Sequence, residues 1–246
     1  MRVRLNQVIE HAQRLALQWG LVVQRKKITN QPMQRLAQLL KNRDVGLVFD
    51  VGANTGQFAE ELLEAGFDGR IVSFEPLPDE WRILSSRAAK WSTWEVSPRC
   101  ALGNSDGEVD IHVAGNSQSS SILPMEHAHV TAAPESRYIR TEKVPLRQFS
   151  SVAQPWLAGG AAYCVKLDVQ GFEDPVIEGM GEHFAHATVV LRELSLTPMY
   201  RGEPLLEAAI QQMRNAGFMP WAIDPVFLNR ETGQLLQVEM TFVRES

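Results

Sequence analysis

Apolar positions along this chain follow two periods that alternate from one segment to the next. Apolar runs typical of buried strands occupy residues 47–51, 70–74, 93–97, 163–167, 188–194, 218–223 and 238–243. Apolar residues at helical spacing occupy residues 56–65, 79–89, 173–180 and 204–216. Strands that alternate with helices predict an α/β fold with one doubly wound sheet. Asn229 and Gly233 lie between the last two runs and predict a hairpin there.

The first strand ends in the turn that carries most of the functional information. Residues 47–58 read LVFDVGANTGQF, so that Asp50 closes an apolar run, and Gly52 and Gly56 precede a helical segment. In open α/β sheets, ligands bind at such strand-to-helix turns. Gly52 permits a sharp turn, and Gly56 would let the backbone approach a ligand because it has no Cβ. The alternative is that the glycines serve helix packing alone, as in a flavodoxin-like or hydrolase fold.

The turn differs from the dinucleotide fingerprint G-x-G-x-x-G, in which a helix N-terminus faces a pyrophosphate. Here Asp50 stands at the strand end, and Asn54 stands where a glycine would be. A carboxylate at this place repels a pyrophosphate and attracts an ammonium or sulfonium group. In the next strand, Glu75 lies 25 residues beyond Asp50 and can accept both ribose hydroxyls in either cofactor class. The turn therefore favours S-adenosylmethionine over NAD.

Five segments of the chain together resemble one family. They read DVGANTGQF, SFEPLPDEW, ALGNSDGEVDIHV, SQSSSIL and VKLDVQGFEDPVIEGM, in family order and at family-like spacing, and the likeness spans roughly residues 45–242. The chain is thereby similar to the FkbM family of S-adenosylmethionine-dependent methyltransferases. The resemblance implies a class I, Rossmann-like methyltransferase fold, mostly parallel with an antiparallel last strand. It also implies methyl transfer, usually to a hydroxyl oxygen of a sugar, a glycolipid or a secondary metabolite.

Candidate cofactor residues cluster at the ends of the first strands. We expect the methionine part at the first turn, the ribose at Glu75, and the adenine ring against two apolar residues that can equally belong to the core. The predicted cofactor-binding residues are Asp50, Gly52, Asn54, Thr55, Gly56, Phe58, Glu75, Ala101, Leu102 and Asp168. Two positions depart from the family pattern: Gln170 replaces the glutamate of D-x-E-G, and Arg147 replaces the aspartate of an L-D pair.

Methyl transfer to oxygen requires an aligned acceptor and a group that takes its proton as charge develops. Asp168 and Glu193 close two central strands, where a charged residue is costly unless it faces a cleft or a partner, so both are candidate proton acceptors. Histidine titrates near neutral pH, which makes His127 and His129 further candidates. The alternatives are helix capping or ion pairing for the carboxylates and simple exposure for the histidines.

A divalent metal held by Asp168 and Glu193 would be another means of lowering the pKa of an acceptor hydroxyl. Gln170 removes a charge from such a site, so metal dependence is not favoured, and no His or Cys cluster in the sequence suggests zinc. Three other functions stay open. They are methylation of nitrogen or of a non-sugar hydroxyl, a nicotinamide-dependent oxidoreductase, which the missing third glycine disfavours, and a nucleotide-binding module without activity.

Residues 104–150 interrupt the alternation of strands and helices. Asp106 and Gly107 form a turn signal, and residues 108–113 alternate polar and apolar positions as a half-buried strand does. The polar stretch 116–121 follows. Long connections inside compact domains are usually lids or binding loops, so we predict an acceptor-recognition insert, with a solvated loop as the alternative.

Residues 1–44 form a predicted helical extension ahead of a methyltransferase domain at residues 45–246. Pro32 opens its second helix. The first has basic neighbours and apolar residues at helical spacing, namely Leu5, Val8, Ile9, Ala12, Leu15, Ala16 and Trp19. We expect it to pack on the core or on a second subunit of a homo-oligomer. Contact with an anionic membrane surface is the alternative, and it would suit a glycolipid acceptor.

Composition limits the class of protein. At 246 residues and 44% hydrophobic, the chain can bury one sizeable α/β core. A net charge of −5 argues against a nucleic-acid target read through a basic face. Cys100 and Cys164 lie in apolar contexts without a C-x-x-C pair, which fits a reducing cytoplasm. No signal peptide or spanning segment is apparent. We therefore expect a cytoplasmic enzyme with a small-molecule or glycolipid acceptor.

Overall fold

A seven-stranded sheet forms the centre of the molecule, in a computed structural model that describes residues 15–19, 31–157, 160 and 162–245. The strand order is β3-β2-β1-β7-β8-β10-β9. The strands are β1 Leu47–Val51, β2 Arg70–Phe74, β3 Trp94–Val96, β7 Tyr163–Leu167, β8 Ala187–Ser195, β9 Phe218–Leu228 and β10 Leu235–Arg244. Each corresponds to one of the seven predicted apolar runs, and residues 229–233 form the predicted hairpin loop.

The strand directions identify the fold. Strand β1 is parallel to β2 and β7, and β7 is parallel to β8, whereas β10 runs antiparallel to both β8 and β9. Chain order reverses between the neighbours β1 and β7, which is the switch point where doubly wound sheets bind ligands. The predicted class I methyltransferase fold, with its antiparallel last strand, is therefore confirmed.

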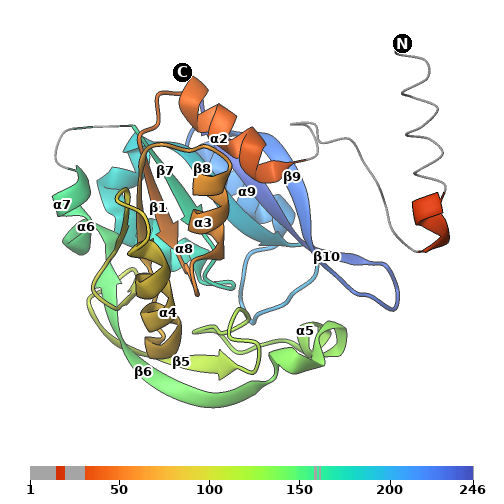
Figure 1. Cartoon of the computed structure of the whole chain (residues 1–246). Helices are drawn as coiled ribbons and strands as arrows, with labels where there is room; N and C mark the ends of the chain where they lie inside the picture. Colours follow the sequence, from red (N-terminus) through yellow and green to blue (C-terminus); the bar gives the residue numbers. More distant parts are fainter. Residues whose placement is uncertain (1–14, 20–30, 158–159, 161, 246) are drawn as a thin grey trace, which may run out of the picture.

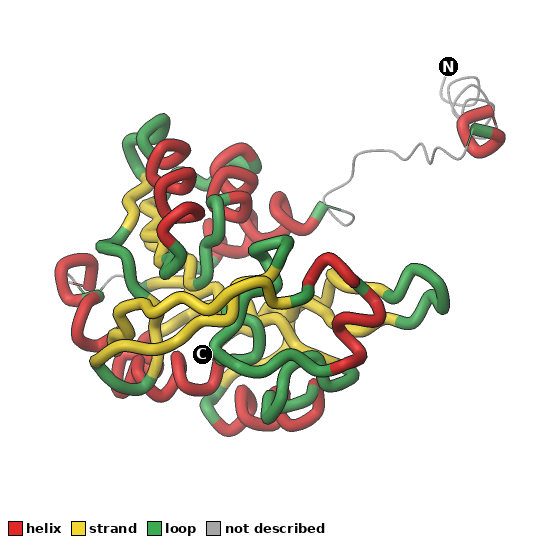
Figure 2. Tube along the Cα trace, turned by 90° about the horizontal axis from the view of Figure 1, so that it is seen from below, coloured by secondary structure: helices red, strands yellow, loops and turns green. Residues whose placement is uncertain are grey.

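Helices cover both faces of this sheet (Figures 1 and 2). Alternate strand residues serve the two faces: Val48 packs with one set of helices, and Phe49 and Val51 with the other. The first set comprises α2 Pro32–Asn42, α3 Gln57–Glu64 and α4 Pro78–Ala88. The second set comprises α6 Phe149–Val152, α7 Gln154–Leu157, α8 Glu173–Met180, the 3₁₀ helix η3 Gly181–His186 and α9 Leu206–Asn215. Burial on both sides explains why the central strands β1, β2, β7 and β8 read as apolar runs.

The predicted insert is an ordered second sheet. Its three strands have the order β4-β6-β5, and Figure 1 places β5 and β6 on the side toward which the arrow of β1 points. Its elements are β4 Ala101–Gly103, β5 Gly107–Ala114, α5 His127–Ala132, the 3₁₀ helix η2 Pro134–Ser136 and β6 Tyr138–Gln148. The alternative of a solvated loop is wrong, because Ile111, Val113 and Val144 form a small buried core between these strands.

The N-terminal extension is described only in part. Helix α2 begins at the predicted Pro32 and buries Leu36, Leu39 and Leu40 against the core, so this part of residues 1–44 belongs to the folded domain. Most of the first predicted helix and its basic neighbours lie outside the described residues, so its contact with a membrane or a second subunit stays a prediction. Within the part of the chain that the structure describes, no helix has the length and apolar character needed to cross a bilayer.

Candidate active site

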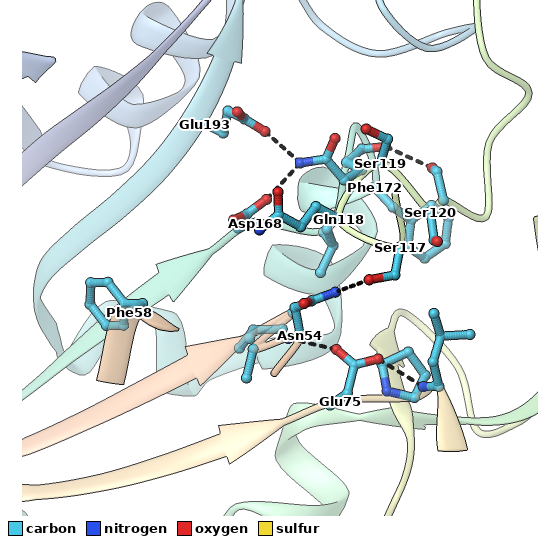
Figure 3. A pocket seen from close by; sticks show the side chains of 18 of the residues that line it. Asn54, Phe58, Glu75, Ser117, Gln118, Ser119, Ser120, Asp168, Phe172 and Glu193 are labelled. Carbon is cyan, nitrogen blue, oxygen red and sulfur yellow. Dashed lines mark hydrogen bonds between the residues drawn. The ribbon is translucent and has the colours of Figure 1, made fainter. Parts of the chain in front are cut away.

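A cavity of about 510 Å³ lies where β1, β2 and β7 end, facing the small sheet. Its walls include the turn after β1, the end of β2 and the turn after β7. Residues 116–122 of the insert also line it, and we call residues 116–121 the roof segment (Figure 3). The cavity thus occupies the switch point, and its size is in the range of small-molecule sites.

The turn after β1 depends on glycine for reasons of packing as well as conformation. Gly52 and Gly56 have φ angles of 77° and 91°, in the left-handed region that glycine tolerates. A Cβ on Gly52 would lie 1.9 Å from the carbonyl oxygen of Asp168, because the turn after β7 passes beside it. A Cβ on Gly56 would lie 2.6 Å from the ring of Trp94. Gly56 therefore serves packing and does not line the cavity, so its expected approach to a ligand is not supported.

Asp50 lies beneath the cavity rather than in its wall. The carboxylate is fully buried, accepts a hydrogen bond from Ser73 Oγ at 3.1 Å, and lies 3.3 Å from Lys166 Nζ. Burial raises the pKa of Asp50, and Lys166 opposes that shift. Because Asp50 does not line the cavity and its charge faces an internal ammonium, the expected direct contact with a charged methyl donor is not supported. Thr55 does not line the cavity either.

Glu75 occupies the position expected for a ribose-binding carboxylate. It lines the cavity, and its two oxygens each accept a backbone N–H at 2.8 Å, from Asn54 and from Leu77. Burial raises the pKa of Glu75 to about 8, although these two hydrogen bonds lower it. A carboxylate offers about four acceptor positions, so two remain for a pair of hydroxyls. The arrangement fits the predicted role.

Other predicted cofactor residues also reach the cavity. Gly52, Asn54, Phe58 and Asp168 line it. Ala101 and Leu102 line it as well, and each belongs at the same time to a buried apolar cluster.

An acidic pair lies at the far side of the cavity. The amide Nε2 of Gln170 donates to Asp168 Oδ1 and to Glu193 Oε2, both at 2.7 Å (Figure 3). The second oxygen of Asp168 lies 3.2 Å from Lys166 Nζ. Burial, with repulsion from Asp168 and Glu173, raises the pKa of Glu193 well above its ordinary value. The two predicted proton acceptors therefore lie together but in different environments.

The two candidate histidines separate in the structure. His127 is exposed, pairs through Nδ1 with Thr131 Oγ1 at 3.1 Å, and does not line the cavity, so its predicted catalytic position is not supported. His129 is buried and lines the cavity, with the rings of Tyr200 and Phe227 centred 5.2 Å away. Burial lowers the pKa of His129 to about 4, so its imidazole is neutral at pH 7.

The roof segment is bonded to both sides of the cavity, which sequence reasoning missed. Asn54 Nδ2 donates to Ser117 Oγ at 3.1 Å, and Ser121 Oγ donates to the carbonyl oxygen of Gln170 at 2.7 Å. Tyr200 donates to Gln170 Oε1 at 2.6 Å. The motif SQSSSIL was the available signal for the serines, whereas nothing in the sequence indicated Tyr200.

A metal site is not apparent among the described residues, where no group of three or more His, Cys, Asp or Glu side chains is arranged to hold an ion. The amide of Gln170 presents N–H donors, not lone pairs, toward Asp168 and Glu193.

One protein-family model matches the part of the chain that forms the cavity. The model of the methyltransferase FkbM domain matches residues 50–220, which include the turn after β1, Glu75, the roof segment and the acidic pair. No curated protein matches the chain in sequence.

Solved structures of several methyltransferases are similar in fold. The 1,6-didemethyltoxoflavin N1-methyltransferase of Burkholderia thailandensis, with bound S-adenosylhomocysteine, has 15% identity over 89% of this chain and 80% of its own, with a TM-score of 0.44. Magnesium protoporphyrin IX methyltransferase of Synechocystis PCC 6803, with bound S-adenosylmethionine, has 9% identity over 87% and 79%, with a TM-score of 0.46. Precorrin-6y C5,15-methyltransferase of Geobacter metallireducens has 13% identity over 92% and 94%, with a TM-score of 0.44.

Proposed function

The chain belongs to the FkbM family of S-adenosylmethionine-dependent methyltransferases, and from this premise we propose that it methylates a hydroxyl oxygen of a sugar, a glycolipid or a secondary metabolite. The observation that carries the proposal is the shared cavity, in which Glu75 lies on one side and the Asp168–Glu193 pair on the other. Donor and acceptor can therefore meet inside one site.

The residues present fit the methyl donor. Glu75 keeps acceptor positions for the two ribose hydroxyls, while Gly52 gives the methionine part backbone without a side chain and Asn54 offers a polar one. Ala101 and Leu102 offer apolar surface to the adenine ring. S-adenosylmethionine supplies an activated methyl group when bound, so the protein has to orient the acceptor and accept one proton.

Glu193 is the proposed proton acceptor. Asp168 has both oxygens engaged, one by Gln170 and one by Lys166. Glu193 has one oxygen engaged by Gln170 and lines the cavity. S-adenosylmethionine, when bound, would supply the methyl group, and Glu193 would take the hydroxyl proton of the acceptor. His129, neutral at pH 7, is placed to hydrogen-bond the acceptor.

The acceptor side favours an uncharged, hydroxyl-rich molecule. The roof segment contributes serine, asparagine and glutamine side chains, and Phe227 contributes a ring. Of the described residues that line the cavity, Lys166 is the one Lys or Arg, and it is already paired with Asp50 and Asp168. A phosphate-bearing acceptor would therefore lack a cation to bind.

The cytoplasm is the proposed compartment. Cys100 and Cys164 are buried free thiols, which is consistent with a reducing environment.

Calorimetry and an acceptor screen test the proposal. S-adenosylmethionine and S-adenosylhomocysteine should bind and NAD should not, and Glu75→Ala should abolish that binding. A screen with labelled donor should then reveal transfer to a glycan, glycolipid or natural-product hydroxyl. Transfer only to nitrogen would favour the N-methyltransferase alternative. Binding of NAD alone would favour the oxidoreductase.

The variant Glu193→Gln separates catalysis from binding. We expect it to keep donor affinity and to lower kcat by about 100-fold or more, because a general base typically contributes that much. Equal losses of donor binding and of kcat would assign Glu193 a structural role instead.

A further inference from the structure

Gln170 lies on the acceptor side of the cavity, and both ends of its side-chain amide, as well as its backbone carbonyl, form hydrogen bonds. Its Nε2 reaches both carboxylates of the acidic pair at 2.7 Å, its Oε1 accepts from Tyr200 at 2.6 Å, and its backbone carbonyl accepts from Ser121 at 2.7 Å. In Figure 3, dashed lines from the labelled Asp168 and Glu193 meet at one nitrogen atom, and the two hydrogen bonds identify it as Nε2 of Gln170. One neutral side chain therefore connects two acids and a phenol.

The contacts fix which end of the amide faces the acids. Nε2 carries two N–H donors, one for each carboxylate, while Oε1 can only accept and meets the hydroxyl of Tyr200. The reversed orientation would place Oε1 between the oxygens of Asp168 and Glu193, where only a protonated acid could donate to it. The hydrogen-bond network thus determines the orientation.

The backbone at this position is held in an uncommon conformation. Gln170 has a φ of 55°, in the left-handed region that costs free energy for a residue with a Cβ. Such a conformation persists where surrounding contacts hold it, and here Ser121 and Tyr200 do so. The surrounding contacts therefore fix both the backbone and the side chain of Gln170.

We propose that Gln170 is the positioning residue that makes Glu193, and not Asp168, the proton acceptor. By donating one N–H to each, Gln170 holds the two carboxylates at a fixed separation. Asp168 then has its second oxygen engaged by Lys166, whereas the second oxygen of Glu193 is left for the acceptor. This inference rests on the proposed function and names how that same site is organised.

Charge explains why an amide serves better here than a carboxylate. Glu193 faces Asp168 from β7, Glu173 from α8, and Glu239, its cross-strand neighbour on β10. Lys166 acts on Asp168 and Glu239, and Arg192 acts on Glu173, while Tyr200 is uncharged at neutral pH because its raised pKa keeps the phenol protonated. A third carboxylate at Gln170 would add repulsion, whereas its amide hydrogen bond lowers the pKa of Glu193.

The titration of Glu193 tests this role without an acceptor. We would label glutamate side chains with ¹³C at the carboxyl carbon, follow them by NMR against pH in the S-adenosylhomocysteine complex, and assign Glu193 from Glu193→Gln. In Gln170→Leu, which keeps side-chain bulk and removes the donors, the midpoint of Glu193 should rise by about one pH unit. In Gln170→Glu it should rise further. Gln118→Leu is the matched control, since that glutamine lines the cavity without bonding either acid, and it should leave the midpoint unchanged.

Kinetics with an acceptor from the screen give the second readout. In Gln170→Leu, the acid limb of the pH profile of kcat should move to higher pH by the same amount as the titration midpoint of Glu193 measured by NMR. The affinity for the donor should stay unchanged. An unchanged Glu193 midpoint in Gln170→Leu, or an equal shift in Gln118→Leu, would overturn the proposal. A shifted midpoint without transfer to any acceptor would support the role of Gln170 and count against the proposed function.

Discussion

The sequence indicated which charged residues lie at the strand ends, but it did not indicate which side chains they contact. Glu75 and Glu193 reach the cavity as their positions at the ends of strands indicated. Asp50 also closes a strand, but its register neighbour on β7 is Lys166, and that pairing turns its carboxylate into an internal counter-ion. Register between strands more than 100 residues apart depends on the whole sheet, so no local pattern could reveal it.

The carboxyl of Glu75 predicts a pH dependence of donor binding. With its pKa raised to about 8 in the cofactor-free protein, Glu75 is mostly protonated at pH 6 and 7. In the proposed role of Glu75, two ribose hydroxyls bind the ionised form. Binding should then release a proton, and affinity for S-adenosylhomocysteine should rise by up to about tenfold per pH unit until pH 8. Calorimetry in two buffers of different ionisation enthalpy measures the released proton.

Glu75→Gln is the control for this dependence. It should bind more weakly, and it should lose the part of the pH trend that Glu75 causes. A trend of equal slope in the variant would show that another group is responsible.

At the scale of elements, apolar periodicity predicted the large sheet well and the small one poorly. The central strands β1, β2, β7 and β8 are buried on both faces, and apolar runs mark them, whereas the edge strand β9 is mostly exposed or half-buried. Strand β6 is mostly exposed or half-buried along its length and contains Pro145, so its sequence lacks the signal of a buried strand. The roof segment has no periodicity, and its place over the cavity follows from tertiary hydrogen bonds.

Because the turns after β1 and β7 lie close together, we expect a substitution at Gly52 to destabilise the fold strongly. Gly52→Ala should lower the free energy of unfolding by about 3 kcal/mol or more, since its Cβ would overlap the backbone of Asp168 in addition to straining φ. Gly66→Ala is the matched control, with a φ of 99° and open space around the Cβ, and should cost about 1 kcal/mol. Urea unfolding of both variants measures the difference. Equal costs would mean that the backbone of Asp168 can move aside.

The whole molecule combines a negative charge with an acidic cavity. The net charge is −5, and Glu75, Glu193 and Glu239 line the cavity. Burial raises the pKa of all three glutamates, so the negative net charge, more than the cavity itself, disfavours a polyanion.

We accordingly expect no appreciable affinity for RNA. Fluorescence anisotropy with labelled tRNA at about 150 mM salt should show a Kd no tighter than about 10⁻⁴ M, at the weak end of non-specific binding. A micromolar Kd that weakens steeply with salt would instead reveal a basic surface and reopen a nucleic-acid acceptor.

The separation of the two sheets has an evolutionary consequence. The turn after β1, Glu75 and the acidic pair all belong to the large sheet, whereas the roof segment is carried by the small one. Mutations in the roof segment that spare Ser117 and Ser121, which bond Asn54 and Gln170, can therefore accumulate while the transfer machinery stays intact. One ancestral scaffold could in this way diversify toward many metabolites, and grafting residues 104–148 between relatives would be a direct route to engineering new selectivity.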